Sequence, residues 1–189
     1  MDRKCSASLE FGGIYSGRIE MRYFWIFLAC CCFGEPLSTE APILKHVETQ
    51  LPCFGVLKRS DSFVYLDISD GYIHKLISYI ENEGFVKPPY FAKVGSVGAH
   101  ITVISAMESK RWGIERVEEV GEIIHFTPKE CQIVYPPRWG GRDSAYILLV
   151  EAPEFHEIRE KYGLPKAKFD FHITIGVKYE NESEETIHF

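Results

Sequence analysis

Two copies of the tripeptide His-Ile-Thr, at His100–Thr102 and at His172–Thr174, constrain this chain more than any other feature of its sequence. Each copy lies in a stretch of β-branched and aromatic residues, AHITVI and FDFHITIGV, which predicts a strand. Side chains two positions apart in a strand point to the same face. Each strand should therefore present one imidazole and one hydroxyl on a common face, with Ile101 and Ile173 turned toward the core.

The same order of elements surrounds both motifs. The first half is predicted to run strand 63–68, helix 72–83 and strand 99–104, and the second strand 145–150, helix 154–162 and strand 169–177. Asp70 is expected to cap the first helix and Gly84 to end it. This repeated order predicts a duplicated architecture, although the two halves share little sequence outside the motifs.

Two further strands are predicted between the halves, at 121–126 and 132–135, paired around Thr127-Pro128. Taken together, the elements indicate the α+β class, α/β-like in its strand–helix–strand units. We expect the sheets to face each other across a central cleft that holds both motifs.

Two histidines and two hydroxyls on facing strands suit the cleavage of a phosphodiester. The unperturbed imidazole pKa lies near physiological pH, so one histidine can take a proton from water or an alcohol while the other donates one to the leaving oxygen. Thr102 and Thr174 can hold the phosphoryl oxygens on which charge gathers in the transition state. The arrangement predicts His100, His172 and the two threonines as catalytic residues, and it requires no cofactor.

The motifs His100-Ile101-Thr102-Val103 and His172-Ile173-Thr174-Ile175 resemble those of the 2H phosphoesterase superfamily, which carries two His-x-Thr/Ser motifs, each followed by an apolar residue. The resemblance covers about residues 60–178. It implies a bilobal fold of two pseudo-symmetric strand–helix–strand lobes around a central cleft. It also implies metal-independent hydrolysis or transfer at cyclic or 2′,5′-type phosphodiesters, commonly at RNA ends.

A glycine-rich loop, PPRWGGR at 136–142, is a candidate substrate-binding segment. Arg138 and Arg142 could contact phosphate and Trp139 could stack on a base, with Tyr135 as a further base contact. The alternative is an ordinary exposed turn.

The net charge of −6 argues against a protein that coats long nucleic acid, which usually carries a basic excess. We therefore expect an RNA end or a small nucleotide as the partner, bound in a local positive pocket by a monomeric protein. Lys93 and Lys168, which each precede a motif strand, could supply positive charge, or they could simply be solvated.

The N-terminal part of the chain contains an apolar run, Tyr23–Phe33, after Met21 and Arg22. Its length and basic flank are typical of a secretory signal, and it is short for a membrane span. We predict an extension with a linker at 1–43 and a 2H phosphoesterase-like domain at 44–189. The protein would be secreted or membrane-associated if 21–33 is a signal, and cytoplasmic if the run is a buried segment.

Two other functions remain open at this point. The fold could bind a nucleotide or phosphate without turnover, although both motifs are intact. A metal could be held by His100, His172 and His125, but no cluster of Asp and Glu accompanies them and the six cysteines lack zinc-site spacing. We therefore expect no metal site.

Overall fold

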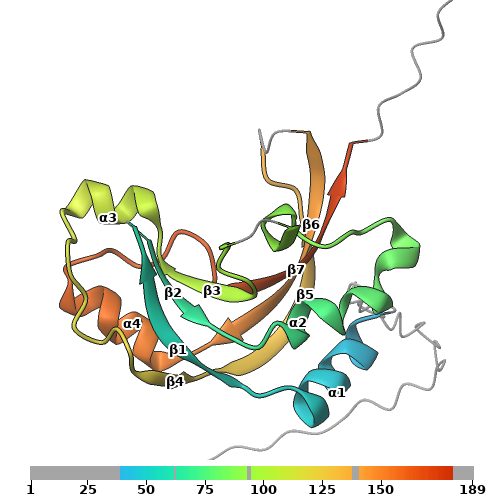
Figure 1. Ribbon diagram of the computed structural model, residues 1–189, viewed down its shortest axis with the longest axis horizontal. Coiled ribbons are helices and arrows are strands. Elements are labelled where there is room, and N and C mark those ends of the chain that lie inside the picture. Colours follow the sequence, from blue (N-terminus) through green and yellow to red (C-terminus); the bar gives the residue numbers. More distant parts are fainter. Residues whose placement is uncertain (1–38, 62, 93–94, 138–140, 181–189) are drawn as a thin grey trace, which may run out of the picture. The chain divides into compact units, whose positions relative to one another are not determined.

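The computed structural model of the protein describes residues 39–61, 63–92, 95–137 and 141–180 (Figure 1). These residues form an α+β fold with one seven-stranded antiparallel sheet. The strands are β1 (Phe54–Ser60), β2 (Phe63–Asp67), β3 (His100–Ile104), β4 (Ile123–His125), β5 (Thr127–Val134), β6 (Arg142–Glu151) and β7 (His172–Tyr179). The α-helices are α1 (Glu40–Gln50), α2 (Gly71–His74), α3 (Ala106–Trp112) and α4 (Pro153–Lys161), and the 3-10 turns are η1 (Ile77–Tyr79), η2 (Glu81–Glu83) and η3 (Pro89–Ala92).

The strands follow the order β4-β1-β2-β3-β7-β6-β5 across the sheet. The two edge strands, β4 and β5, are consecutive in the chain, with only Phe126 between them. A chain can step from one edge to the other in a single residue only if the edges come together, so the sheet must be strongly curled. Figure 1 shows this curvature, with β4 leading directly into β5 along the lower side of the sheet.

The core lies against the face of β3 and β7 that carries the isoleucines between and after the motif residues. Ile101, Ile173 and Ile175 are fully buried, as the two-residue periodicity predicts. Phe155 of α4 is also fully buried and packs edge-on against Phe171, just before β7. The histidines and threonines consequently point away from the core.

Residues 40–43, predicted to belong to the N-terminal extension and its linker, form the first turn of α1 instead, and this helix continues to Gln50. Ile43 and Val47 of this helix are fully buried in the core. The Glu40 carboxylate also accepts a hydrogen bond from the Cys131 backbone N–H of β5. Pro42 and the polar neighbours suggested a linker, but Pro is tolerated in a first helical turn, so the apolar spacing determines the structure.

The helix predicted at 72–83 is wrong as a continuous element. The segment forms the single turn α2 and then the 3-10 turns η1 and η2, although its apolar residues are buried at helical spacing. This segment packs closely on β7, where a Cβ at Gly176 would lie 2.9 Å from Ile80 Cδ1 and 3.2 Å from Phe85 Cβ. Gly84 ends it with a positive φ of 87°, as expected.

The strands predicted at 121–126 and 132–135 exist in part, as β4 and β5, but they do not pair with each other. β4 pairs with β1, and β5 pairs with β6. The expected pair of facing sheets is also wrong, because β3 and β7 are neighbours in one sheet. The two pseudo-symmetric lobes stay a prediction.

The apolar run Tyr23–Phe33 lies outside the described residues, and so do the residues after Glu180. Among the helices that the structure describes, none has the length and apolar character needed to cross a membrane.

Candidate active site

The two His-Ile-Thr motifs meet side by side on the central strands β3 and β7. Ile101 pairs with Ile173 in antiparallel register, so each motif histidine lies opposite the threonine of the other strand. The four polar side chains share the face of the sheet opposite the buried isoleucines. The sequence reasoning brought these four residues together on one surface, and the structure places them there.

The two imidazoles are held in the same way. Nδ1 of His100 lies 2.8 Å from the Gly98 carbonyl oxygen, and Nδ1 of His172 lies 2.8 Å from the Asp170 carbonyl oxygen. A carbonyl oxygen only accepts, so in each case Nδ1 carries the proton and donates it. Nε2 is then the nitrogen that each ring has available for chemistry on the shared face.

The His100 imidazole has a lowered pKa. Burial lowers it most, the hydrogen bond to the Gly98 carbonyl acts in the opposite direction, and the nearby His172 lowers it further. The influence of one imidazole on the other reflects their proximity on adjacent strands. His100 is therefore neutral at physiological pH and can accept a proton at Nε2.

Three aromatic rings surround His100. The rings of Phe63 and Tyr65 contact it edge-on, at centroid distances of 5.7 and 5.8 Å, and the Tyr90 ring lies at 5.3 Å. Burial raises the pKa of Tyr90 to about 12, although the nearby Thr174 side chain acts to lower it. Tyr90 thus keeps its proton at neutral pH and adds a third hydroxyl to the face that carries the threonines.

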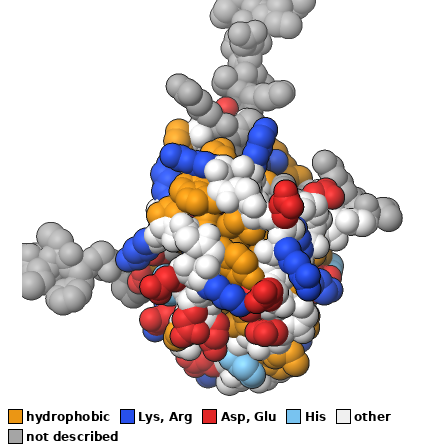
Figure 2. Space-filling model, turned by 90° about the vertical axis from the view of Figure 1, so that its left-hand side faces the viewer, with side chains coloured by type: hydrophobic (Ala, Val, Ile, Leu, Met, Phe, Trp, Pro, Cys, Tyr) orange, Lys and Arg blue, Asp and Glu red, His pale blue; other side chains and the backbone are white. Residues whose placement is uncertain are grey.

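A pocket of about 470 Å³ opens beside Thr102 and His172. One wall is α3, and the other is the chain segment 165–171 that leads into β7. We call it the α3 pocket. Figure 2 looks onto the side of the molecule that carries α3 and α4, where a band of hydrophobic side chains is flanked by Lys and Arg and, lower down, by Asp and Glu.

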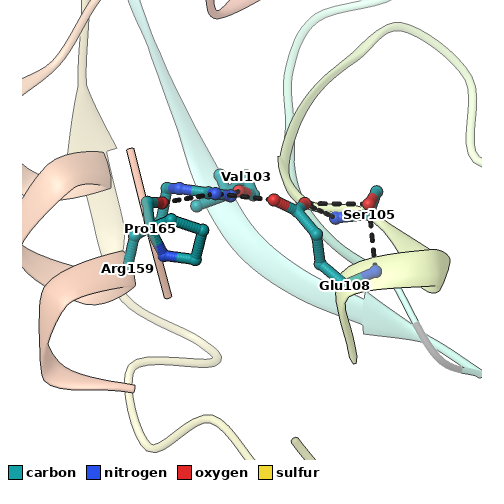
Figure 3. Close-up of polar contacts among 5 residues, drawn as sticks. All are labelled: Val103, Ser105, Glu108, Arg159 and Pro165. Atoms are coloured by element: carbon teal, nitrogen blue, oxygen red, sulfur yellow. Dashed lines mark hydrogen bonds and ion pairs between the residues drawn. The ribbon is translucent and has the colours of Figure 1, made fainter. Parts of the chain in front are cut away.

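A buried guanidinium joins the walls of this pocket (Figure 3). The side chain of Arg159 on α4 is 3% exposed and donates hydrogen bonds to the carbonyl oxygens of Val103, at 2.8 Å, and Pro165, at 2.8 Å. It also forms an ion pair with the Glu108 carboxylate at 2.6 Å. One charged group therefore fixes the end of β3, the start of α3 and the segment before β7 relative to one another.

Glu108 is held from its other side by a capping box. Ser105 accepts a hydrogen bond from the Glu108 backbone N–H, and the Glu108 carboxylate accepts from both the hydroxyl and the backbone N–H of Ser105. Burial acts to raise the pKa of Glu108, but the hydrogen bonds from Arg159 and Ser105 outweigh it and lower the pKa to about 2.

The depressed pKa of Glu108 predicts an acid-dependent loss of stability. Because the folded pKa of about 2 lies below the ordinary 4.5, the contribution is present above about pH 4.5 and is lost as the pH falls toward 2. Denaturant unfolding at several pH values in this range should show a smaller pH dependence in Glu108→Gln than in the wild type. An unchanged dependence would mean that other carboxylates dominate acid unfolding.

Asp70 and Gly98 fix the start of β3. Asp70 occupies the N-cap position of α2, but its side chain makes no cap hydrogen bond. Its carboxylate instead accepts the Ala99 backbone N–H at 2.9 Å. Gly98 has a φ of 69°, and a Cβ there would lie 2.5 Å from Asp70 Oδ1. Asp70, expected to cap a helix, thus fixes the Gly98–Ala99 peptide, whose carbonyl oxygen orients His100. We call this contact the brace.

Gly98→Ala should therefore damage both stability and the site. Forcing a side chain into the left-handed region costs about 1–2 kcal/mol, and the clash with Asp70 would shift the carbonyl that holds His100 Nδ1. Gly95→Ala is the matched control, because Gly95 also has a positive φ, of 80°, but a Cβ there would have nothing within 4 Å. Equal losses of turnover in both variants would show that the brace does not position His100.

The described residues of the predicted substrate loop do not lie beside the motifs. Arg138 and Trp139 lie outside the described residues. Arg142 pairs with Tyr179, at the opposite end of β7 from His172, and Tyr135 is 68% exposed after the end of β5. The roles proposed for these four residues stay predictions.

The three histidines suggested as metal ligands do not come together. His125 is on the edge strand β4, and β1 and β2 lie between it and His100. In the part of the chain that the structure describes, no group of three or more His, Cys, Asp or Glu side chains is placed to hold a metal ion.

Sequence reasoning missed α3 and its pocket, and it also missed Tyr90. The signal for α3 was present: Ser105-x-x-Glu108 directly after the first motif strand is a capping-box pattern. Tyr90 lies in a proline-containing loop, where no periodicity relates it to Thr174 or His100. Lys168, considered as a source of local positive charge, does line the α3 pocket.

A protein-family model described as "Swiss Army Knife, 2H phosphoesterase domain" matches residues 64–183 of the chain. The matched region runs from β2 to just beyond β7 and includes both motif strands. Comparison with curated proteins and comparison with solved structures each found no match.

Proposed function

The chain belongs to the 2H phosphoesterase superfamily, and on this basis we propose that it hydrolyses cyclic or 2′,5′-type phosphodiesters at RNA ends or in small nucleotides, using His100 and His172 without a metal. The observation that carries the proposal is the antiparallel pairing of the motifs, in which each histidine lies opposite the threonine of the other strand. A phosphate placed over this pairing has an imidazole on two sides and a hydroxyl beside each imidazole.

His100 is the general base in this proposal and His172 the general acid. His100 is the histidine with the lowered pKa, so it is neutral and its Nε2 takes the proton from the attacking water. The water oxygen forms a bond to phosphorus as the bond from phosphorus to the leaving oxygen breaks. Protonated His172 donates its Nε2 proton to that leaving oxygen, and its Nδ1–H remains on the Asp170 carbonyl.

The hydroxyls stabilise the charge on the non-bridging phosphoryl oxygens. Thr102 and Thr174 are the donors expected from the motifs, and the Tyr90 hydroxyl near the Thr174 side chain adds a further donor. The net charge of −6 fits a protein that handles an end or a small fragment rather than a long polyanion. A monomer would suffice, because one chain supplies both motifs.

The test uses the purified full-length chain and three substrates: an oligonucleotide ending in a 2′,3′-cyclic phosphate, a 2′,5′-linked dinucleotide and a nucleoside 2′,3′-cyclic phosphate. Each is incubated in excess chelator and, in parallel, with added divalent cation. We expect at least one substrate to be cleaved at the same rate in both conditions. Loss of cleavage in chelator would contradict the metal-independent mechanism, and phosphate-ligand binding without cleavage would favour the binding-module function.

A further inference from the structure

The α3 pocket lies beside only one of the two motif histidines. It opens beside His172 and Thr102, whereas His100 is packed among Phe63, Tyr65 and Tyr90. A phosphate between the histidines would therefore have room for a large substituent on the His172 side. On the His100 side, the aromatic rings occupy the space next to the imidazole.

The pocket walls each carry a cation stacked on an aromatic ring. On α3, the Arg111 guanidinium lies 4.8 Å from the Trp112 ring centroid, and on the opposite wall the Lys168 ammonium lies 5.1 Å from the Phe169 ring centroid. Both rings keep solvent contact, with Trp112 37% and Phe169 70% exposed. Exposed aromatic rings beside cations are the side chains with which proteins stack nucleobases and contact phosphates.

The pocket also has a local charge that differs from that of the whole chain. Arg111, Lys166 and Lys168 line it, against the single unpaired carboxylate of Asp170, because Glu108 is neutralised by Arg159. A chain with net charge −6 thus presents a cationic pocket next to one of its two motif histidines. This is the local positive site that an acidic protein would need in order to bind a polyanionic fragment.

The walls are fixed relative to each other before any ligand binds. Arg159 is bonded to Glu108 on the α3 wall and to the Pro165 carbonyl on the opposite wall (Figure 3). It also holds the Val103 carbonyl, one residue after Thr102. The buried Arg159 side chain therefore fixes the spacing between Trp112 and Phe169. Ligand binding then carries little entropic cost for ordering the pocket walls.

We propose that the α3 pocket binds the nucleobase of the nucleotide whose phosphate lies between the histidines, stacked on Trp112, with Arg111 and Lys168 contacting an adjoining phosphate. This deepens the proposed function and rests on it: the substrate carries a base on its His172 side, so the leaving oxygen that receives the His172 proton belongs to that nucleoside. A cyclic phosphate without a base would bind weakly.

Binding is measured separately from turnover. Adenosine 3′-monophosphate and ribose 3-phosphate, neither of which contains a diester, are titrated into the full chain while tryptophan fluorescence and heat are recorded. We expect the nucleotide to bind at least ten-fold more tightly than the base-free phosphate and to quench the fluorescence of Trp112. Trp112→Ala should weaken nucleotide binding about ten-fold, since stacking on one aromatic ring is worth roughly that factor or more.

The matched controls are Phe54→Ala, which removes an exposed aromatic ring from β1, and Lys110→Ala, which removes a cation of α3 that does not line the pocket. Neither should change the ratio of the two dissociation constants. Equal affinity for the two ligands, or a Trp112→Ala ratio equal to that of the wild type, would overturn the nucleobase assignment.

Measurements of substrate cleavage distinguish the nucleobase-binding inference from the proposed phosphodiesterase function. If the chain cleaves a base-free ribose 2,3-cyclic phosphate as efficiently as adenosine 2′,3′-cyclic phosphate, the catalytic proposal stands and the nucleobase pocket falls. If it cleaves neither but still binds the nucleotide through Trp112, the pocket stands and the phosphodiesterase proposal falls.

Discussion

Replacing either His100 or His172 with alanine is expected to lower kcat/KM for the cleaved phosphodiester by about a hundred- to ten-thousand-fold, the range typical of a general acid or base. The two losses should not multiply in the double variant, because either histidine alone leaves the proton transfer incomplete. His125→Ala is the matched control, since His125 is an exposed histidine on the edge strand β4 and has no proposed role. Its rate should equal that of the wild type.

The pH profile assigns the roles of the two histidines. With His100 as base, the wild-type profile of kcat/KM should rise as His100 loses its proton, at a pH below the ordinary imidazole value because the pKa of His100 is lowered. His100→Ala should remove this rising limb, whereas His172→Ala should lower the rate and keep the limb. His→Asn variants, which can retain a side-chain N–H for the Gly98 or Asp170 carbonyl, should fold like the wild type and remain inactive. A loss below ten-fold in both alanine variants would contradict the two-histidine mechanism.

Arg159→Met is expected to lower the free energy of unfolding by about 3–5 kcal/mol, the usual cost of removing one partner from a buried ion pair. The substitution preserves much of the side-chain volume, but it removes the Arg159 donor from Glu108 Oε1 and from the carbonyl oxygens of Val103 and Pro165. Denaturant unfolding of the purified variant measures the loss. KM for a nucleotide substrate should also rise, because both walls of the α3 pocket lose their common anchor.

Two further variants show how much of the lost stability comes from the ion pair between Arg159 and Glu108. The double variant Arg159→Met with Glu108→Gln should regain part of the stability, because the uncompensated carboxylate is gone, and the coupling energy of the cycle gives the strength of the ion pair. Lys161→Met on the same helix is the control. Lys161 forms its ion pairs with Glu118 and Glu119 at the surface, so its effect should be far smaller. Similar losses of stability for Arg159→Met and Lys161→Met would show that the buried network stabilises the fold no more than the surface ion pairs do.

The strand periodicity predicted the placement of the motif side chains better than the fold around them. The period of a strand is short and strict, so two His-Ile-Thr motifs were enough to place two imidazoles and two hydroxyls on one face. Pairing of the strands is a long-range property, and local patterns could not say that β4 and β5, adjacent in the chain, would lie at opposite sheet edges. The brace made by Asp70 likewise joins residues far apart in sequence, which a capping rule cannot detect.

The segment after β2 shows why a helical pattern can mislead. The spacing of Ile73, Leu76, Ile77 and Ile80 fits a helix, and all four are buried. The close contact with Gly176 of β7 leaves little room above the strand, and the chain there is wound as separate short turns. Burial was predictable from the pattern, whereas the exact winding depends on a partner strand that comes almost a hundred residues later.

The pairing of β3 with β7 also has a consequence for how the chain folds. All of α3, β4, β5, β6 and α4 lie between these strands in sequence, so the pair closes a very long loop of chain. Contacts of such high sequence separation slow folding and tend to form once much of the remaining structure is in place. Neither half of the chain carries both imidazoles. The appearance of activity during refolding would therefore mark the completion of the central pair, and a truncated or arrested chain would hold no partly active form.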